Sequence, residues 1–355
     1  MKLRHGIVAA TLGMLTAASY AQSSVTLYGI ADVGLEYLSN VPSASGGASQ
    51  VKVTSGSMST SRWGLRGTED LGGGLRAIFE LEGGLALDRG AQLNSSRMFD
   101  RGAFVGLASK YGTLTLGRQN TPLHETGLEL DPMGYAPRYS LFMSDYVMAG
   151  RADNAIKYRG DFGGLSATVL YSTARTSSGE LPGDYKVDRN YGVALMYRAG
   201  PLVVGAAYDE FQGNSVATRD LTDRRALIGA SYAFGPTRAF AGYRWFNGDV
   251  GTLPGTGSNL FWAGLRYAMS PAITLTGAAY YTDTRNSGAD PIMFVASAAY
   301  AFSKRTDIYM NVGYALNRGD SELGLNGFNM PGNSPTHVVP GKDQTGVVVG
   351  LRHTF

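Results

Sequence analysis

The sequence predicts an all-β protein, a transmembrane antiparallel 16-stranded β-barrel with long external loops and short periplasmic turns. Three observations support this fold. Apolar and polar residues alternate along most of the chain, short turns recur at regular intervals between longer connections, and the composition is rich in glycine and tyrosine.

The composition is unusual for a soluble globular domain. Glycine accounts for 49 of the 355 residues and tyrosine for 21, whereas charged residues make up only 17%. Soluble domains average about 7% glycine and roughly 25% charged residues. The lack of cysteine excludes disulfides and thiol chemistry. Glycine and tyrosine together favour close-packed strands with aromatic anchors.

The N-terminal stretch "MKLRHGIVAATLGMLTAASYAQ" has basic Lys2 and Arg4, an uncharged segment, and small residues at Ser19 and Ala21. This order is typical of a secretory signal peptide, so we expect residues 1–21 to be removed and 22–355 to form the barrel. A retained membrane helix is the alternative, but the polar stretch "QSSVT" follows at once. The remaining chain has 29 basic and 28 acidic residues, a net charge of +1, and we expect no nucleic-acid partner.

The alternation of residues predicts strands with one apolar and one polar face. In "VTLYGIADVGLEYL", Leu27 and Leu35 share one face while Asp32 and Glu36 share the other. The stretch "TDIYMNVGYALN" near residue 310 repeats the pattern. No uncharged run beyond Asp32 reaches the roughly 20 apolar residues that a spanning helix needs.

Seven short turns divide the chain. Five follow an aromatic residue at intervals of 33 to 39 residues, each interval being long enough for two strands and one long loop. With the two chain ends on the same side as the seven turns, the chain forms eight hairpins, which gives sixteen strands. The turns are "GTEDLGGG" (67–74), "SKYGT" (109–113), "YRGDFGGL" (158–165), "YRAGPL" (197–202), "YAFGPT" (232–237), "YAMSPA" (267–272) and "YAFSKRT" (300–306). We expect long loops at 39–50, 88–96, 119–150, 175–189, 211–222, 247–258, 283–291 and 317–343.

Lipid explains which face of each strand points outward. Hydrocarbon offers no partner for backbone groups, so a sheet in a membrane must close on itself. In "SRWGLRGTEDLGGGLRAIFELEGG", Trp63, Leu65 and Phe79 then face lipid, and the charged partner face points into the lumen. A soluble sandwich would bury the same apolar face. It leaves the signal peptide, the turn spacing and the aromatic residues at the turns unexplained.

Four stretches in order carry a family likeness. The sequences "SSVTLYGIADVGLEY", "RWGLRGTEDLGGGL", "RGAFVGLASKYGTLTLGRQ" and the terminal "VGLRHTF" resemble the general porins of Gram-negative outer membranes. The resemblance implies a homotrimer in the outer membrane, in contact with outer-membrane lipid and lipopolysaccharide, that passes small hydrophilic solutes. It also implies that the third external loop, best matched by residues 119–150, folds inward as a constriction loop. An ordinary exposed loop is the alternative.

The same resemblance implies a constriction between arginines on the wall and acids on the loop. Alternation places the wall candidates on the lumen face, and Glu80 is the inward acid expected to hold the arginines together. The alternative is that lumen arginines only satisfy the interior wall. The wall candidates are Arg62, Arg101, Arg151, Lys157 and Glu80, and the loop candidates are Glu125, Glu129 and Asp131.

The last strand ends at Phe355, and His353 stands where many relatives carry tyrosine. A terminal phenylalanine resembles the signal that the barrel-insertion machinery reads. The alternative is that Phe355 only anchors the chain at the membrane interface.

No catalytic, cofactor-binding or metal-binding motif is present in the sequence. The four histidines are scattered, and "HET" at His124 lacks the second histidine of a zinc site. We expect this loop histidine to be solvated. The stretch "LGGGL" sits in a turn between strands and does not match a phosphate loop.

The sequence therefore predicts a water-filled channel for passive diffusion of small hydrophilic solutes and ions, with no cofactor and no enzymatic activity. A field between wall arginines and loop acids would act on the solutes in the constriction. A substrate-specific channel would need an aromatic track, for which Tyr28, Tyr280 and Tyr309 are too scattered. An adhesin or an outer-membrane hydrolase is a further alternative. The pattern leaves the sign of the ion selectivity open.

Overall fold

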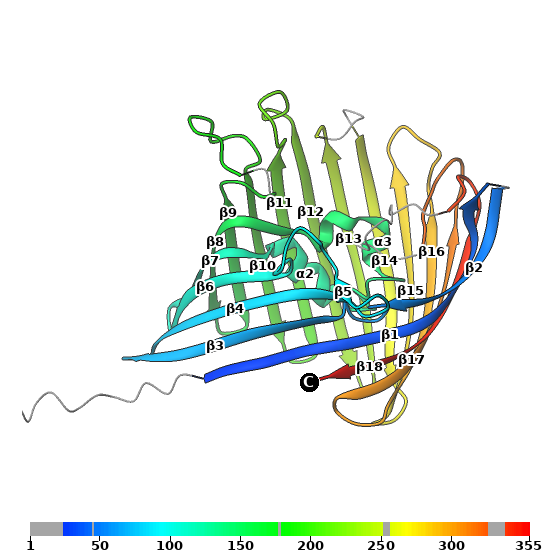
Figure 1. Cartoon of the computed structure of the whole chain (residues 1–355), viewed down its shortest axis with the longest axis horizontal. Coiled ribbons are helices and arrows are strands. Elements are labelled where there is room, and N and C mark those ends of the chain that lie inside the picture. Colours follow the sequence, from blue (N-terminus) through cyan, green and yellow to red (C-terminus); the bar gives the residue numbers. More distant parts are fainter. Residues whose placement is uncertain (1–23, 45, 177–178, 251–255, 326–337) are drawn as a thin grey trace, which may run out of the picture.

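The structure, a computed structural model, describes residues 24–44, 46–176, 179–250, 256–325 and 338–355. Its strands form a barrel around a lumen that holds two short helices (Figure 1). The expected signal peptide lies outside the described residues. No helix in the described ranges is long and apolar enough to cross a membrane.

The elements follow the predicted hairpin pattern. The strands are β1 (Ser24–Ser43), β2 (Gly46–Ser55), β3 (Arg62–Gly72), β4 (Leu75–Ala86), β5 (Ala91–Gln92), β6 (Gly102–Ser109), β7 (Gly112–Asn120), β8 (Arg151–Phe162), β9 (Leu165–Ser172), β10 (Asn190–Ala199), β11 (Leu202–Gln212), β12 (Thr222–Phe234), β13 (Thr237–Gly248), β14 (Thr256–Ala268), β15 (Ile273–Thr284), β16 (Ile292–Ala301), β17 (Thr306–Leu316) and β18 (Gln344–Thr354). The helical elements are α2 (Pro122–Leu130), α3 (Leu141–Ser144) and η1 (Tyr146–Ala149).

Antiparallel pairing closes the sheet between the first and last strands. β1 pairs with β18 from Ile30 opposite Thr354 to Leu38 opposite Gly346. On its other side, β1 pairs with β3 through its first half and with β2 through its second half. β2 and β3 are thus two parts of one wall strand, interrupted at residues 56–61, while the two-residue β5 pairs only with β4. The described wall therefore has the predicted sixteen strands.

All seven predicted turns are confirmed between consecutive strands, but the first predicted long loop is wrong. β1 continues to Ser43 and β2 begins at Gly46, so residues 39–50 are mostly strand. The register shifts between Leu38 and Val41, where Asn40 has a positive φ of 52°. Asparagine tolerates this conformation, so polar residues that read as a loop form a strand irregularity instead.

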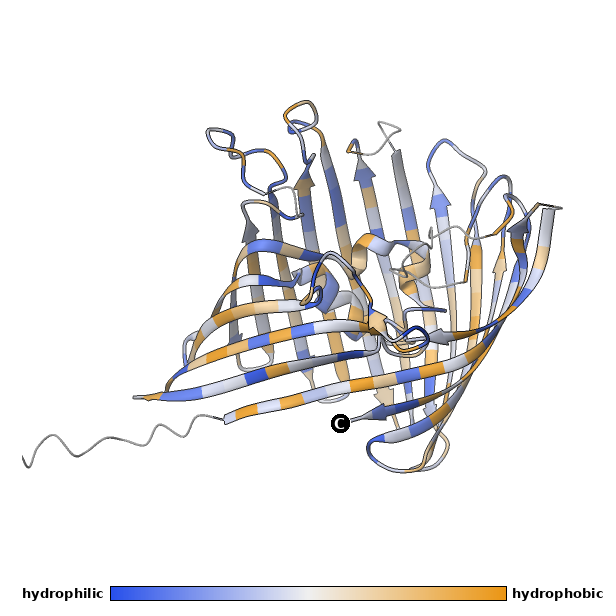
Figure 2. Ribbon diagram, in the orientation of Figure 1, coloured by the Kyte–Doolittle hydropathy of each residue, from blue (hydrophilic) through white to orange (hydrophobic). Residues whose placement is uncertain are grey.

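The predicted faces of the strands are confirmed. Leu27 and Leu35 on β1 are 59% and 57% exposed on the outside, whereas Asp32 and Glu36 are fully buried on the inside. Hydrophobic and hydrophilic residues alternate along the wall strands (Figure 2). Lipid therefore takes the place of a hydrophobic core outside the wall.

Residues 121–150, here called L3, leave the wall after β7 and lie inside the barrel. Thr121 caps α2 by accepting a hydrogen bond from the backbone N of His124 at 3.2 Å, and Pro122 occupies the first turn. α2 packs against the inner side of β10 and β11. Leu123 and Leu130 of α2 join a buried cluster with lumen-facing wall residues such as Trp262, which fixes L3 across the lumen.

Candidate functional site

Glu82 joins two of the candidate wall arginines. Arg62 opens β3, and its Nε lies 3.2 Å from Oε2 of Glu82 on β4. The Nε of Arg101, which precedes β6, donates to Oε1 of the same carboxylate at 2.7 Å. One carboxylate on β4 therefore serves two guanidinium groups, one from β3 and one from just before β6, the strands on either side of it.

Glu80 does not form these ion pairs, contrary to our expectation. Strand pairing gives the reason, because Glu80 lies opposite Arg66 whereas Glu82 lies opposite Gly64 on one side and Gly102 on the other. This register brings Glu82 closer than Glu80 to Arg62 and Arg101, while Tyr28 and Glu80 fill the space over the two glycines. Within the described residues, Glu80 has no cationic nitrogen within 4.0 Å of its carboxylate.

Arg151 is held by backbone carbonyl groups. Its Nε donates to the carbonyl oxygen of Arg101 at 2.9 Å, and its Nη1 lies 3.5 Å from the carbonyl oxygen of Ala149. In the described part of the chain, no carboxylate oxygen lies within 4.0 Å of its guanidinium nitrogens. The positive charge of Arg151 is therefore oriented without being neutralised by an ion pair.

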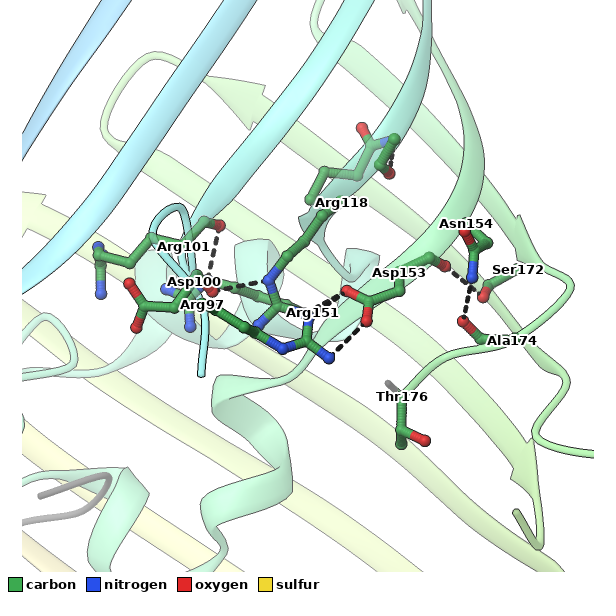
Figure 3. A network of polar contacts seen from close by, with 12 residues as sticks. Arg97, Asp100, Arg101, Arg118, Arg151, Asp153, Asn154, Ser172, Ala174 and Thr176 are labelled. Atoms are coloured by element: carbon green, nitrogen blue, oxygen red, sulfur yellow. Dashed lines mark hydrogen bonds and ion pairs between the residues drawn. The ribbon is translucent and has the colours of Figure 1, made fainter. Parts of the chain in front are cut away.

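A second network ties the loop between β4 and β6 to the wall behind Arg151 (Figure 3). Asp153 on β8 accepts from Nη1 of Arg97 at 2.7 Å and from Nη1 of Arg118 at 2.5 Å. Arg118 also donates through Nε to the carbonyl oxygen of Asp100 at 2.7 Å. Sequence reasoning missed this network because Arg97 and Asp100 lie in an irregular loop without alternation.

Two of the three candidate loop acids form ion pairs with wall cations. The Oε1 of Glu125 lies 2.6 Å from Nζ of Lys157, and Glu129 accepts from Nε and Nη2 of Arg198 at 3.0 and 2.5 Å. These pairs fix α2 to β8 and β10. The structure thus brings Lys157 and Glu125 together and gives Glu129 a partner that we did not expect.

Asp131 does not face the lumen water, contrary to our expectation. Its side chain is buried and accepts hydrogen bonds from Oη of Tyr280 at 2.6 Å and from the backbone N of Tyr135 at 2.8 Å. Burial raises the pKa of this carboxyl group, against the lowering effect of the Tyr280 hydrogen bond. Asp131 therefore attaches L3 to β15.

The end of L3 is held by an ion-pair cluster that sequence reasoning missed. Oδ2 of Asp145 lies 2.9 Å from Nε of Arg225 and 3.1 Å from Nε of Arg244. Burial acts to raise the pKa of Asp145, but Arg225 and Arg244 outweigh it and hold the pKa below its ordinary value. The charge of Asp145 is therefore stabilised inside the barrel.

Glu36 on β1 anchors the middle of L3. It accepts from Nη1 of Arg138 at 2.9 Å and from Oη of Tyr139 at 3.1 Å. Alternation placed Glu36 inside the barrel, but it did not indicate which loop residues would reach it.

The wall arginines and L3 enclose a cavity of about 340 Å³, here called the eyelet. Its charged wall residues include all three candidate arginines together with Glu80 and Glu82. L3 contributes side chains without net charge, and none of its three candidate acids lines the cavity. The charged residues of the lining are Arg62, Glu80, Glu82, Asp100, Arg101 and Arg151, and the L3 residues include His124, Leu128, Tyr135 and Phe142.

His124 is buried, which makes the expectation of a solvated histidine wrong. Its ring lies edge-on to Tyr135 with centroids 5.4 Å apart. Burial, and secondarily the charge of Arg151, holds its pKa well below the ordinary value. The histidine is therefore neutral at physiological pH and adds no charge to the eyelet. No group of three His, Cys, Asp or Glu side chains among the described residues is placed to hold a metal ion.

Phe355 lies at the seam of the barrel. Its backbone N donates to the carbonyl oxygen of Gly29 at 3.1 Å, and the reverse bond has the same length. A Cβ on residue 29 would lie only 2.4 Å from Cζ of the Phe355 ring, so the seam requires glycine there. The role of Phe355 as an assembly signal stays a prediction.

The sequence model of the Gram-negative porin family matches residues 8–320. The chain belongs to this family. Outer membrane porin protein 32 of Delftia acidovorans is 32% identical to this porin over 99% of the chain and 100% of its own length. An outer membrane porin protein of Bordetella pertussis is 30% identical over 98% of the chain and 99% of its own length.

Solved structures agree with this assignment. An anion-selective porin from Comamonas acidovorans matches with a TM-score of 0.80 and 29% identity, covering 94% of this porin and 100% of that chain. OmpTdeltaL8, a loop-deletion mutant of Vibrio cholerae OmpT, has a TM-score of 0.67 and shares the fold at 17% identity. The predicted family, barrel and outer-membrane location are confirmed, and the porin is a channel for passive diffusion.

Proposed function

We propose that small hydrophilic solutes and ions cross this porin through the eyelet, and that anions cross more easily than cations. The proposal rests on which of the charged side chains at the eyelet wall are paired and which are not. Glu82 is shared by Arg62 and Arg101, while Arg151 has no carboxylate within 4.0 Å in the described part of the chain. In a narrow passage with walls of low dielectric constant, such charge acts strongly on passing ions.

The acids of L3 contribute less to this field than the sequence predicted. Glu125 and Glu129 are paired with wall cations, and Asp131 is buried. The loop side of the eyelet consists of neutral side chains such as Tyr135 and Phe142. The field therefore starts from the arginine wall and is balanced mainly by Glu80, Glu82 and Asp100 on that same side, instead of by acids across the pore.

The similar structure from Comamonas acidovorans supports the sign of the selectivity, since it is described as an anion-selective porin. The structural match covers 100% of the Comamonas acidovorans chain.

Reversal potentials in planar bilayers test the proposal. In a salt gradient, the wild-type potential should lie on the anion side, and Arg62→Ala should shift it towards cations because Glu82 loses one of its two partners. Arg318→Gln is the matched control, since Arg318 lies exposed in the loop after β17 and should leave the potential unchanged. An equal reversal potential for wild type and Arg62→Ala would show that Arg62 does not lie on the ion path.

We also propose a homotrimer whose outer faces contact outer-membrane lipid and lipopolysaccharide, and whose C-terminal strand with Phe355 is read by the insertion machinery. The trimer should open in conductance steps grouped in threes. Conductance of the folded protein that always changes in single, ungrouped steps would contradict the homotrimer. We propose no catalytic residue, because diffusion through a water-filled channel requires none.

A further inference from the structure

A second cavity, of about 560 Å³, lies between the end of L3 and the loop-side ends of β8, β11, β12 and β13. We call it the vestibule site. Arginine and aromatic side chains gather around it from separate elements, and the residues that the argument uses are Tyr146, Arg151, Arg175, Phe211, Arg225 and Phe246. Its size falls within the roughly 300–1,000 Å³ of small-molecule sites.

Two guanidinium groups in the vestibule site are stacked on phenyl rings. The Cζ of Arg175 lies 4.0 Å from the ring centroid of Phe211, and that of Arg225 lies 4.1 Å from the centroid of Phe246. Stacking fixes the plane of a guanidinium while its N–H edges stay available to an acceptor. The rings therefore orient the arginines and also add apolar surface beside them.

The two arginines differ in their partners. Arg225 is paired with Asp145 and has Asp223 3.7 Å from its Nη1. Arg175 has no carboxylate within 4.0 Å among the described residues, and its Nε is buried without a hydrogen-bond partner. The carboxylate of Asp209 accepts a hydrogen bond from Asn190 through Oδ1 and acts on Arg175 only through its charge, from beyond 4.0 Å. Of the arginines that line this cavity, Arg175 and Arg151 therefore have no carboxylate within 4.0 Å in the described part of the chain, and Arg175 is the one of these two that is stacked on a ring.

Arg151 connects the vestibule site to the eyelet, because it lines both cavities. The guanidinium of Arg175 lies beside Gly150, the residue before Arg151. A Cβ on Gly150 would lie 3.2 Å from Nη2 of Arg175, so glycine at 150 leaves room for this approach. An anion held by Arg175 is thus next to the start of the arginine wall.

We propose that the vestibule site binds small aromatic carboxylates of the benzoate class and passes them to the eyelet through Arg151. The carboxylate pairs with the free edge of Arg175 in a charge-assisted, two-point contact. The ring packs against the apolar surface of Phe211, Phe246 and Val147. A small inorganic anion can pair with Arg175 but has no ring to pack against the apolar surface. This inference rests on the proposed function, since it names a solute class for the same pore.

Benzoate block of chloride current tests the site. Sodium benzoate added on the loop side of channels in a planar bilayer should reduce the chloride current at concentrations where acetate has little effect. Arg175→Gln should raise the half-blocking concentration of benzoate about tenfold, as expected for the loss of one charge-assisted contact. The control Arg318→Gln should match wild type. Benzoate block that is unchanged in Arg175→Gln overturns the proposal.

Phe211→Leu tests the aromatic part of the site separately. It keeps every charge but removes the ring under Arg175, so benzoate block should weaken while acetate behaves as in wild type. Equal block by acetate and benzoate in wild type overturns the assignment of an aromatic solute. Chloride conductance of each variant shows whether it is folded and open. Absence of chloride conductance in the wild type contradicts the proposed function itself, whereas conductance without benzoate block contradicts only the vestibule site.

Discussion

The eyelet wall and L3 both place charged side chains inside the barrel, and they use those charges differently. On the wall, Arg62 and Arg101 share one carboxylate and Arg151 faces the cavity without one. On L3, Asp145 is enclosed by two arginines and Asp131 is buried under hydrogen bonds. Wall charge lines the cavity, while most L3 charge attaches the loop to the wall.

This difference follows from what each segment needs in order to keep its place. A wall strand is fixed by backbone pairing on both sides, so its side chains are free to line water. L3 has no strand partner and must be fixed by side chains. Its acids are therefore consumed by contacts with Arg198, Arg225 and Arg244.

The largest effect is expected for Asp145→Asn. It leaves Arg225 and Arg244 buried without their anion, and breaking a buried ion pair costs about 3–5 kcal/mol. The end of L3 should detach, with a lower unfolding temperature in detergent and frequent current fluctuations in bilayers.

Asp184→Asn is the control for this variant, because Asp184 lies in the loop between β9 and β10 and pairs with Arg219 instead of with a residue of L3. It should leave both measurements unchanged. An Asp145→Asn channel as quiet and as stable as wild type would show that L3 is held without its ion pairs.

Acidification should act on the same contact. The pKa of Asp145 is lowered from an unfolded value near 3.8, so its contribution is complete above about pH 4 and is lost as the pH falls through the folded pKa. Asp131, whose pKa is raised, acts with the opposite sign. Current fluctuations of the wild type should therefore increase below about pH 4, and Asp145→Asn should abolish this dependence. A pH response that persists in Asp145→Asn would assign it to another group.

Tyr280→Phe should have a smaller effect. It removes the hydrogen bond from Tyr280 Oη to Asp131 and leaves a buried carboxylate with one acceptor site unfilled, which costs about 1–3 kcal/mol. Thermal unfolding in detergent measures the loss. Tyr309→Phe is a useful comparison, because Tyr309 donates in the same way to buried Asp32 but does so within the wall. Equal fluctuation of the current in both variants would contradict a special role of Asp131 in holding L3.

The sequence predicted the wall better than the loop, for a physical reason. Alternation with period two determines the face of each strand residue, so Arg62 and Glu36 could be placed inside. It does not distinguish Glu80 from Glu82, which share a face. Their roles depend on the strand register, which sets Gly64 and Gly102 beside Glu82.

Loop L3 has no comparable period. The burial of Asp131 and His124 depends on contacts with Tyr280 and Tyr135, which lie elsewhere in the chain or across an irregular turn. An acidic or histidine side chain in a loop is usually solvated. The sequence contains no local sign that these two are enclosed.

The smallest effect is expected when one carboxylate of the wall, Glu82, and one of L3, Glu125, are each replaced by glutamine. Glu82→Gln removes the anion shared by Arg62 and Arg101 at the eyelet and should raise the preference for anions. A unit charge at about 4 Å in water contributes about 1 kcal/mol, so the permeability ratio should rise on the order of fivefold. Glu125→Gln instead frees Lys157 outside the lining of the eyelet and should change the ratio less. Reversal potentials of both variants in the same salt gradient measure the difference. A larger shift for Glu125→Gln would mean that L3 presents its charge to solutes as the wall does, because only a charge on the ion path can change selectivity more than Glu82.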